Sequence, residues 1–449
     1  MKKRLFKVAA FFMSLLMAAG LSACSANQQQ QPASGAVAEN PAPNEPAESK
    51  EIIYWNIGTE SPDKDIYQYA VDKFNANTTS GYKITSVSTQ NDTYKEKLII
   101  AMSSGECPDA YSSWSGGPMI EYINSGFAQP IDDLLKGTPI EAKAMEAALA
   151  QATYNGKIYA VPMLNVSISG IFYNKEIFEK YGVSVPSTLA ELEAASDVFV
   201  ENGITPFALA NGSKWTGSMY FMSLAARKGG LEPFQKAVAG TGTFEDECFE
   251  YAGEKIQEWV KKGYFPDGVN SLSEDDGQAR QLMYQETAAM LLCGSWYTGT
   301  FQSDSPEFYK KIGWFSFPKI DGSDADSSIQ IGTVGDQFIS FNCTGDKLKA
   351  CIEFASYWYD DSEIKWMVDN GKIPPVKGVG EMLTDEVTKS ILSAANSASS
   401  VQLWYDQYLP PAVATAHLNT SQEIFGLTMT PSQANVKLQE AMAEYNSSK

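Results

Sequence analysis

The chain has 449 residues, of which 44% are hydrophobic and 20% are charged, and its formal net charge is −20. This acidic balance argues against a nucleic-acid partner, because phosphate binding depends on lysine and arginine. The only histidine is His417, which excludes a histidine-rich zinc site and most serine–histidine mechanisms. We predict neither a metal nor a cofactor, and we expect His417 on the surface or in a helix.

The first 24 residues have the features of a secretory leader. Four basic residues precede an apolar run that ends at Leu21. This run is shorter than the ~20 residues that cross a bilayer, so it predicts a signal peptide over residues 1–23 and not a membrane span. The sequence "LSAC" resembles the lipobox of bacterial lipoproteins, which implies cleavage before Cys24 and acylation of its thiol. The alternative is an ordinary leader with an unmodified cysteine.

Residues 24–50 are rich in Gln, Pro, Ala, Asn and Glu and contain almost nothing that could form a core. They predict a flexible, lipid-anchored tether. The remaining chain of about 400 residues exceeds what one hydrophobic core usually supports and predicts two lobes. Five further cysteines, without a C-x-x-C motif, disfavour a disulfide framework and favour a Gram-positive surface. A bridge between Cys343 and Cys351 stays open as an alternative.

Strands and helices alternate in the first segment after the tether. Strands are predicted at 51–59 and 82–89, with a helix between them at 63–78. A second helix at 93–103 leads to a short strand that ends at Trp114. This alternation predicts a parallel sheet with crossover helices. In such a sheet, ligands bind beyond the carboxyl ends of the strands.

Three side chains with binding potential fall at these strand ends, namely Glu60, Asp92 and Trp114. We consider each of them a candidate ligand contact. Asp92 could instead cap the helix that follows it, and Trp114 could fill the interface between lobes. The residue types alone do not separate these alternatives.

The middle of the chain carries the clearest pattern. A strand into Pro162, an irregular connector and a strand at 167–174 precede a helix that begins near Asn174. Thr188 is followed three residues later by Glu191, and this pair predicts a capped helix start.

The second half begins with a strand from residue 204 that ends in a polar loop at Trp215. Helical segments follow at 216–262 and 275–285, and a buried strand at 288–293 then leads to Trp296, which opens the next helix. Two more strands and four more helices are predicted at 312–320, 332–342, 346–360, 361–370, 383–398 and 431–445.

Three segments carry a family resemblance: "NGKIYAVPMLNVSISGIFYNKEIFEKYG", "AAMLLCGSW" and "KIGWFSFP". They resemble the extracellular solute-binding proteins of sugar ABC importers, the maltodextrin-binding-protein type. The likeness extends over nearly all of residues 51–449. It implies an α/β fold of two periplasmic-binding-protein-like lobes, each a mainly parallel sheet flanked by helices, joined by hinge crossings. The implied boundaries are 51–162 and 332–365 for the N-terminal lobe, and 163–331 and 366–449 for the C-terminal lobe.

The resemblance also implies tryptophans that stack on sugar rings. Trp296 and Trp404 match the two family positions, and Trp215 joins them because its loop "NGSKW" is polar. A pyranose has a weakly apolar C–H face, and burying it against an indole contributes on the order of 1 to 2 kcal/mol. In contrast, Trp259, Trp358 and Trp366 lie at helical spacing with other apolar residues and predict core positions.

Sugar hydroxyls need hydrogen-bond partners, because a buried unpaired one costs ~1 to 3 kcal/mol. We assign this role to seven polar side chains: Glu60, Asp92, Asn165, Asn211, Lys214, Asp336 and Asp406. For Asp336 the alternative is a role in the geometry of the second hinge.

The sequence therefore predicts a monomeric, non-enzymatic lipoprotein on the outer face of the cell membrane. It would capture an oligosaccharide of two to five units and deliver it to the permease of an ABC importer. Two alternatives stay open, a secreted glycoside hydrolase that uses paired carboxylates and a surface carbohydrate adhesin.

Overall fold

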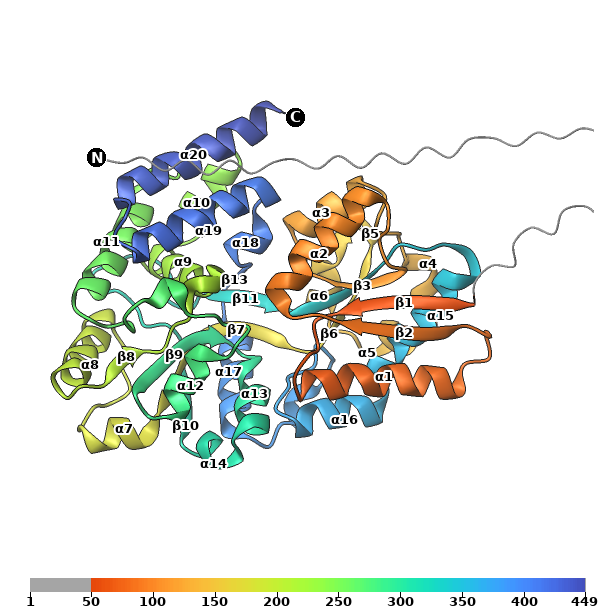
Figure 1. The fold of residues 1–449 in the computed structure, drawn as a ribbon, viewed down its shortest axis with the longest axis horizontal. Coiled ribbons are helices and arrows are strands. Elements are labelled where there is room, and N and C mark those ends of the chain that lie inside the picture. The colour runs from red at the N-terminus through yellow and green to blue at the C-terminus, as the bar shows by residue number, and fades with distance from the viewer. Residues whose placement is uncertain (1–49, 449) are drawn as a thin grey trace, which may run out of the picture. The chain divides into compact units, whose positions relative to one another are not determined.

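The computed structural model describes residues 50–448 (Figure 1). The expected signal peptide, the tether and the acylated Cys24 lie outside these described residues. Among residues 50–448, no helix has the length and apolar character needed to cross a membrane.

The first lobe is built on a five-stranded sheet with the order β2-β1-β3-β12-β6. Its strands are β1 (Glu51–Asn56), β2 (Lys83–Ser88), β3 (Ala110–Ser113), β6 (Ala160–Met163) and β12 (Gln337–Phe341). Its flanking helices are α1 (Asp63–Asn77), α2 (Asn91–Ser104), α3 (Gly117–Asn124), α4 (Asp132–Leu135), α5 (Pro139–Lys143), α6 (Glu146–Gln151), α15 (Gly345–Ser356) and α16 (Asp361–Asp369). A small hairpin joins β4 (Thr153–Tyr154) and β5 (Lys157–Ile158).

The second lobe is built on a six-stranded sheet, on the left in Figure 1, with the order β13-β11-β7-β9-β8 and β10 paired to β7. Its strands are β7 (Val166–Asn174), β8 (Thr205–Phe207), β9 (Ala288–Gly294), β10 (Ile312–Phe315), β11 (Gln330–Val334) and β13 (Val401–Gln402). Its helices are α7 (Lys175–Lys180), α8 (Leu189–Glu201), α9 (Trp215–Gly229), α10 (Glu232–Val238), α11 (Glu247–Lys261), α12 (Gln278–Tyr284), α13 (Tyr297–Asp304), α14 (Pro306–Tyr309), α17 (Glu386–Ser397), α18 (Tyr405–Tyr408), α19 (Pro411–Phe425) and α20 (Pro431–Ser447).

The two-lobed α/β fold is confirmed, but both sheets are mixed instead of mainly parallel. In the first sheet β1 runs parallel to β2 and β3, as the strand–helix alternation predicts, whereas β12 pairs antiparallel with β3 and β6. In the second sheet β7 pairs antiparallel with β9, β10 and β11. The antiparallel pairs arise because strands enter each sheet directly from the other lobe.

The chain passes directly from a strand of one sheet to a strand of the other at two adjacent points, and it enters the second lobe again between α16 and α17. The first is Leu164 and Asn165, between β6 and β7. The second is Gly335 and Asp336, because the single strand expected at 332–342 is two strands, β11 and β12, in different sheets. Gly335 has a φ of +114°, a conformation open mainly to glycine. The backbone N–H of Asp336 donates to the carbonyl of Asn165 over 2.9 Å, so the crossings lie side by side.

Predicted helices and strands are confirmed where the sequence contains a helix-capping pair or a run of buried strand residues. Thr188 and Glu191 form the predicted capping box of α8, and all seven residues of β9 are buried. Trp259 and Trp358 are core residues, while Trp366 is only partly buried. His417 lies in a helix, α19, as one of its two alternatives predicts, although no helix was predicted over residues 411–425. The surface alternative for His417 is wrong. His417 is buried and shares a 2.6 Å hydrogen bond with Ser218.

Candidate functional site

A cavity of about 210 Å³ lies between the two lobes. The first lobe contributes the loop after β1, the start of α2 and the end of β3, which are the strand ends where the sequence predicts ligand contacts. The second lobe contributes the starts of α9 and α13 and the segment around α18. The crossing residues Leu164 and Asp336 form part of the wall.

Trp296 opens α13 immediately after β9, as predicted. The buried strand β9 ends at Gly294, and Ser295 donates from its hydroxyl to the carbonyl of Val166 over 2.9 Å. A Cβ atom at Gly294 would come within 2.0 Å of the Trp296 ring. The ring can therefore lie flat over the strand end only because this residue is glycine.

Three tryptophans from distant segments form one continuous aromatic wall, which we call the tryptophan wall (Trp215, Trp296 and Trp404). The ring centroids of Trp215 and Trp296 are 5.9 Å apart at 62°, and those of Trp296 and Trp404 are 5.7 Å apart at 60°. All three residues line the cavity. The steep angles mean that the rings present differently oriented faces.

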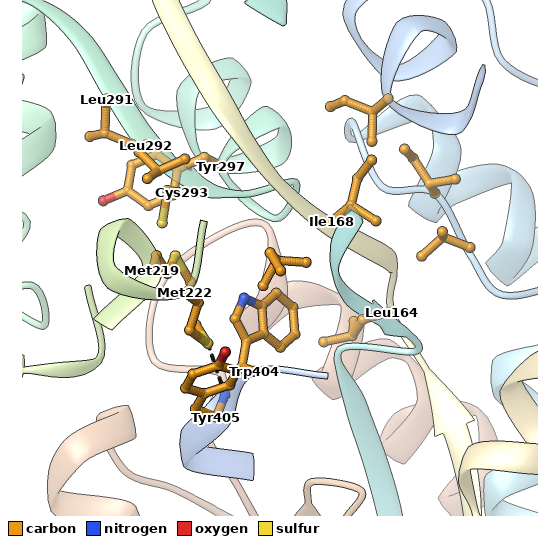
Figure 2. Packing of buried hydrophobic residues seen from close by; sticks show 14 of the residues in the cluster. Leu164, Ile168, Met219, Met222, Leu291, Leu292, Cys293, Tyr297, Trp404 and Tyr405 are labelled. Carbon is orange, nitrogen blue, oxygen red and sulfur yellow. Dashed lines mark hydrogen bonds between the residues drawn. The ribbon is translucent and has the colours of Figure 1, made fainter. Parts of the chain in front are cut away.

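Figure 2 shows Trp404 among Leu164, Met219 and Met222, with the N–H of Tyr405 bonded to the Met222 sulfur over 2.9 Å. The Trp404 side chain is buried, and its Nε1 atom has no hydrogen-bond partner within residues 50–448. A buried indole N–H usually has such a partner.

On the opposite lobe, Trp114 lines the cavity from the end of β3. It is 7% exposed and packs edge-on against Tyr94 at 6.0 Å. The ammonium of Lys95 lies 4.9 Å from its ring centre, within the range of a cation–π interaction. Trp114 is thus both a core residue of the first lobe and part of the cavity wall.

Direct contacts join the lobes beside the cavity. Arg280 on α12 forms an ion pair with Glu60 of the first lobe and another, at 3.0 Å, with Asp304. The backbone N–H of Asp92 donates to the Asp275 carboxylate over 3.0 Å, and the Trp215 indole N–H donates to Asp92 over 3.2 Å.

Two buried carboxyl groups border the cavity. Desolvation raises the pKa of Glu274 to about 7, against a hydrogen bond from the Tyr297 hydroxyl that lowers it. Desolvation likewise raises the pKa of Asp336 to about 7, against the nearby Lys372 ammonium. Burial also raises the pKa of Asp406, which faces Lys95.

Asn165 is hydrogen-bonded to Asp336 of the other crossing and does not line the cavity. Its side-chain amide donates to the Asp336 carboxylate over 3.1 Å and accepts from the backbone N–H of Ile373 over 2.8 Å. Val166 in turn donates to the Ile373 carbonyl over 2.6 Å. A third chain segment is thereby bonded to the two crossings, and Asp336 is bonded within this network as well as lining the cavity.

Seven of the expected ligand contacts line the cavity: Glu60, Trp114, Trp215, Trp296, Asp336, Trp404 and Asp406. Four do not. Asp92 bonds to the opposite lobe, Asn165 to the crossings, and Lys214 to Asn419 over 2.8 Å. Asn211 is fully buried and accepts from the N–H of Gly217 over 3.0 Å.

Sequence reasoning missed Glu274, Arg280 and Tyr297, which also line the cavity. Glu274 lies in an irregular loop, and Arg280 lies on a helix with no distinguishing motif. Tyr297 follows Trp296 directly, and this adjacency was the one available signal. Across residues 50–448, no three His, Cys, Asp or Glu side chains converge as metal ligands.

A family model and several known proteins match this chain. The family model described as bacterial extracellular solute-binding protein matches residues 58–365. An uncharacterized ABC transporter extracellular-binding protein of Pyrococcus horikoshii is 31% identical over 212 residues, which is 46% of this chain and 47% of that protein. The match thus spans about half the length of that relative.

Two solved structures are similar over most of their length. One comes from a study of xylan utilization by Caldanaerobius polysaccharolyticus, with 27% identity and a TM-score of 0.80, and covers 87% of this chain and 99% of that one. The other is a chitin oligosaccharide binding protein, with 26% identity and a TM-score of 0.80, and covers 88% of this chain and 99% of that one.

Proposed function

Because the chain belongs to the bacterial extracellular solute-binding protein family, we propose that it captures an oligosaccharide between its lobes and delivers it to the permease of an ABC importer. The observation that carries this proposal is the tryptophan wall on one side of an interlobe cavity. Relatives of similar fold include a chitin oligosaccharide binding protein, which supports a saccharide as the ligand.

The tryptophan wall suits a saccharide for two physical reasons. Indole faces bury the C–H surfaces of sugar rings, each ring contributing on the order of 1 to 2 kcal/mol. The carboxylates, amides and hydroxyls around the wall accept and donate the hydrogen bonds that sugar hydroxyls require. Rings that meet at about 60° favour a ligand with several differently oriented faces, as successive sugar units have.

The charge of the cavity favours a neutral ligand over an acidic one. Its lining holds two cations, Lys95 and Arg280, and six carboxyl groups: Glu60, Asp63, Glu274, Asp275, Asp336 and Asp406. A carboxylated or phosphorylated sugar would meet like charges in a partly desolvated site, which is unfavourable.

Capture would proceed by closure of the lobes about the crossings at Asn165 and Asp336. The 210 Å³ cavity is smaller than the roughly 300–1,000 Å³ typical of small-molecule sites. An oligosaccharide would therefore enter with the lobes further apart than they are here. Contacts from both lobes would then shift the population toward a closed state, which the permease would recognise.

The remaining parts of the proposal concern location and assembly. We propose acylation at Cys24, residence on the outer face of the cell membrane and action as a monomer without catalysis. Radiolabelled palmitate incorporation, compared between the natural chain and Cys24→Ala, tests the anchor. Label that persists in the variant would contradict it.

The function is tested by a thermal-shift screen against a panel of neutral oligosaccharides, with chromatography of each mixture after overnight incubation. A ligand at 100 times its Kd adds about 2.7 kcal/mol to the free energy of unfolding, so a match gives a clear rise in Tm. A rise with the sugar intact supports the receptor. Shorter products would instead support a glycoside hydrolase, and no rise with any saccharide would contradict both.

A further inference from the structure

Two buried cysteines lie against each other in the first lobe, and neither lines the cavity. The Sγ atoms of Cys343 and Cys351 are 3.6 Å apart. Cys351 is fully buried on α15, whereas Cys343, in the loop between β12 and α15, is 9% exposed. Within residues 50–448 the other three cysteines, Cys107, Cys248 and Cys293, have no such sulfur neighbour.

The backbone around this pair is fixed by bonds on both sides. Asn342 donates from its backbone N–H to the Asp109 carbonyl over 2.8 Å. The Asp109 carboxylate accepts from the backbone N–H of Ile53 over 2.9 Å and from the Lys347 ammonium over 3.1 Å. The sulfur atoms are therefore held close by the fold of the lobe and not by a mobile loop.

We propose that Cys343 and Cys351 form an intramolecular disulfide when the protein meets a disulfide oxidant, whether a small molecule or a protein. The bond requires the sulfur atoms to approach from 3.6 Å to about 2.05 Å. We expect rotation of the two side chains to supply most of this approach, because hydrogen bonds anchor the backbone beside them. The inference is independent of the proposed function, because it involves no cavity residue.

The reaction is a thiol–disulfide exchange in two steps. The Cys343 thiol loses its proton and attacks one sulfur of the oxidant, which forms a mixed disulfide and releases one thiol. The Cys351 thiol then loses its proton and attacks the Cys343 sulfur, which forms the internal bond and releases the second thiol. Two protein thiols are oxidised, and one disulfide is reduced to two thiols.

The order of attack follows from exposure. Cys343 retains access to solvent, and Cys351 has none. The hydrogen bond with Cys343, together with burial, raises the pKa of the Cys351 thiol. Cys351 therefore reacts second, once the mixed disulfide is directly beside it.

The bond would link the end of β12 to α15, eight positions along the chain. Closing even a short loop restricts the unfolded chain and stabilises the folded one. We expect the oxidised protein to melt about 2 to 5 °C above the reduced protein.

Peptide mapping tests the bond directly, because Lys347 and Lys349 lie between the two cysteines. The purified protein is incubated with oxidised glutathione, alkylated without reduction and digested with trypsin. The proposal predicts that peptides 320–347 and 350–365 appear as one linked species, which separates after reduction. Separately alkylated peptides, or glutathione found only on Cys107, would overturn it.

A stability comparison gives a second, independent test. The double variant Cys343→Ser with Cys351→Ser should have the same Tm with and without reductant. In contrast, reduction should lower the Tm of the oxidised natural protein, because it breaks the disulfide. The single variant Cys107→Ser is the matched control and should keep the full response. A response to reductant that persists in the double variant would contradict the proposal.

Discussion

Trp296 is the residue on which the binding account depends most. It is half-buried and contacts both other members of the tryptophan wall. We predict that Trp296→Ala weakens binding of the cognate oligosaccharide about tenfold or more, because one stacking surface contributes on the order of 1 to 2 kcal/mol. Calorimetric titration of the variant measures this loss.

The matched control is Trp366→Ala, which removes another partly buried indole that does not line the cavity. Its ring is tilted against that of Tyr69, with 5.4 Å between the ring centroids. This variant should leave the affinity unchanged. Equal losses in both variants, or a Trp296→Ala protein that does not fold, would make Trp296 a structural residue.

Glu363 predicts a pH dependence of stability. Its carboxyl is fully buried without a hydrogen-bond partner within residues 50–448, and desolvation raises its pKa from 4.5 to about 8. Between these values the folded state keeps a proton that the unfolded state releases, so the free energy of unfolding falls as pH rises from about 4.5 to 8. We expect a loss on the order of 5 kcal/mol from this group.

Urea unfolding of Glu363→Gln between pH 5 and 9 checks this prediction. The variant should lose that part of the pH dependence, whereas Glu440→Gln, on the exposed face of α20, should keep it. An unchanged profile in Glu363→Gln would show that another group is responsible.

At this scale the sequence predicts aromatic contacts better than polar ones. Trp296 and Trp404 were found because a buried strand or a family motif leads to them. Asn165 and Asn211 were indistinguishable from ligand contacts, since an amide at a strand end can equally bond to backbone groups. In the structure both bond to the protein itself.

Among the elements, the two crossings decide how the lobes are joined. We predict that Asn165→Ala lowers the free energy of unfolding by about 2 to 4 kcal/mol, because it removes the acceptor of the buried Ile373 N–H and the side-chain donor to Oδ2 of Asp336. Denaturant unfolding measures this. Asn202→Ala, at the exposed end of α8, is the control and should change stability by less than about 1 kcal/mol. Equal effects would remove Asn165 from the hinge.

Most elements were predicted at the right place, and the exceptions have a physical cause. Residues 332–342 include Thr, Val, Phe and Ile, which are typical of a strand, and nothing among them shows that the chain changes sheets at Gly335. Helix α19 was missed because its buried face includes His417, Thr420 and Ser421, polar residues that weaken an apolar pattern. A polar face buried against other helices is a tertiary effect that local sequence does not contain.

For the whole molecule, we expect contacts between the lobes to affect the relative free energies of the open and closed states. We predict that Arg280→Gln increases the radius of gyration of the sugar-free protein in small-angle X-ray scattering, because it removes the ion pair with Glu60. Glu60→Gln should act in the same direction, and the double variant should add little, since both changes remove one interaction. Additive effects, or no change in either variant, would contradict a role for this pair in closure.

The two-lobed architecture was predictable at this scale because about 400 residues exceed what one hydrophobic core usually supports and because the family resemblance implies two lobes. The direction of the later strands was not, because it depends on which lobe the chain has just left. Nothing in the sequence indicates that Glu60 lies close to Arg280, because the two residues belong to different lobes and meet only in the folded protein.

The most direct test of the central claim is a crystal structure of the protein with the oligosaccharide that raises its Tm most. We predict an intact sugar between the lobes, with one ring flat against Trp296 and hydroxyls bonded to the carboxyl and amide groups around it. A sugar bound on an outer surface, or cleaved products in the cavity, would contradict it.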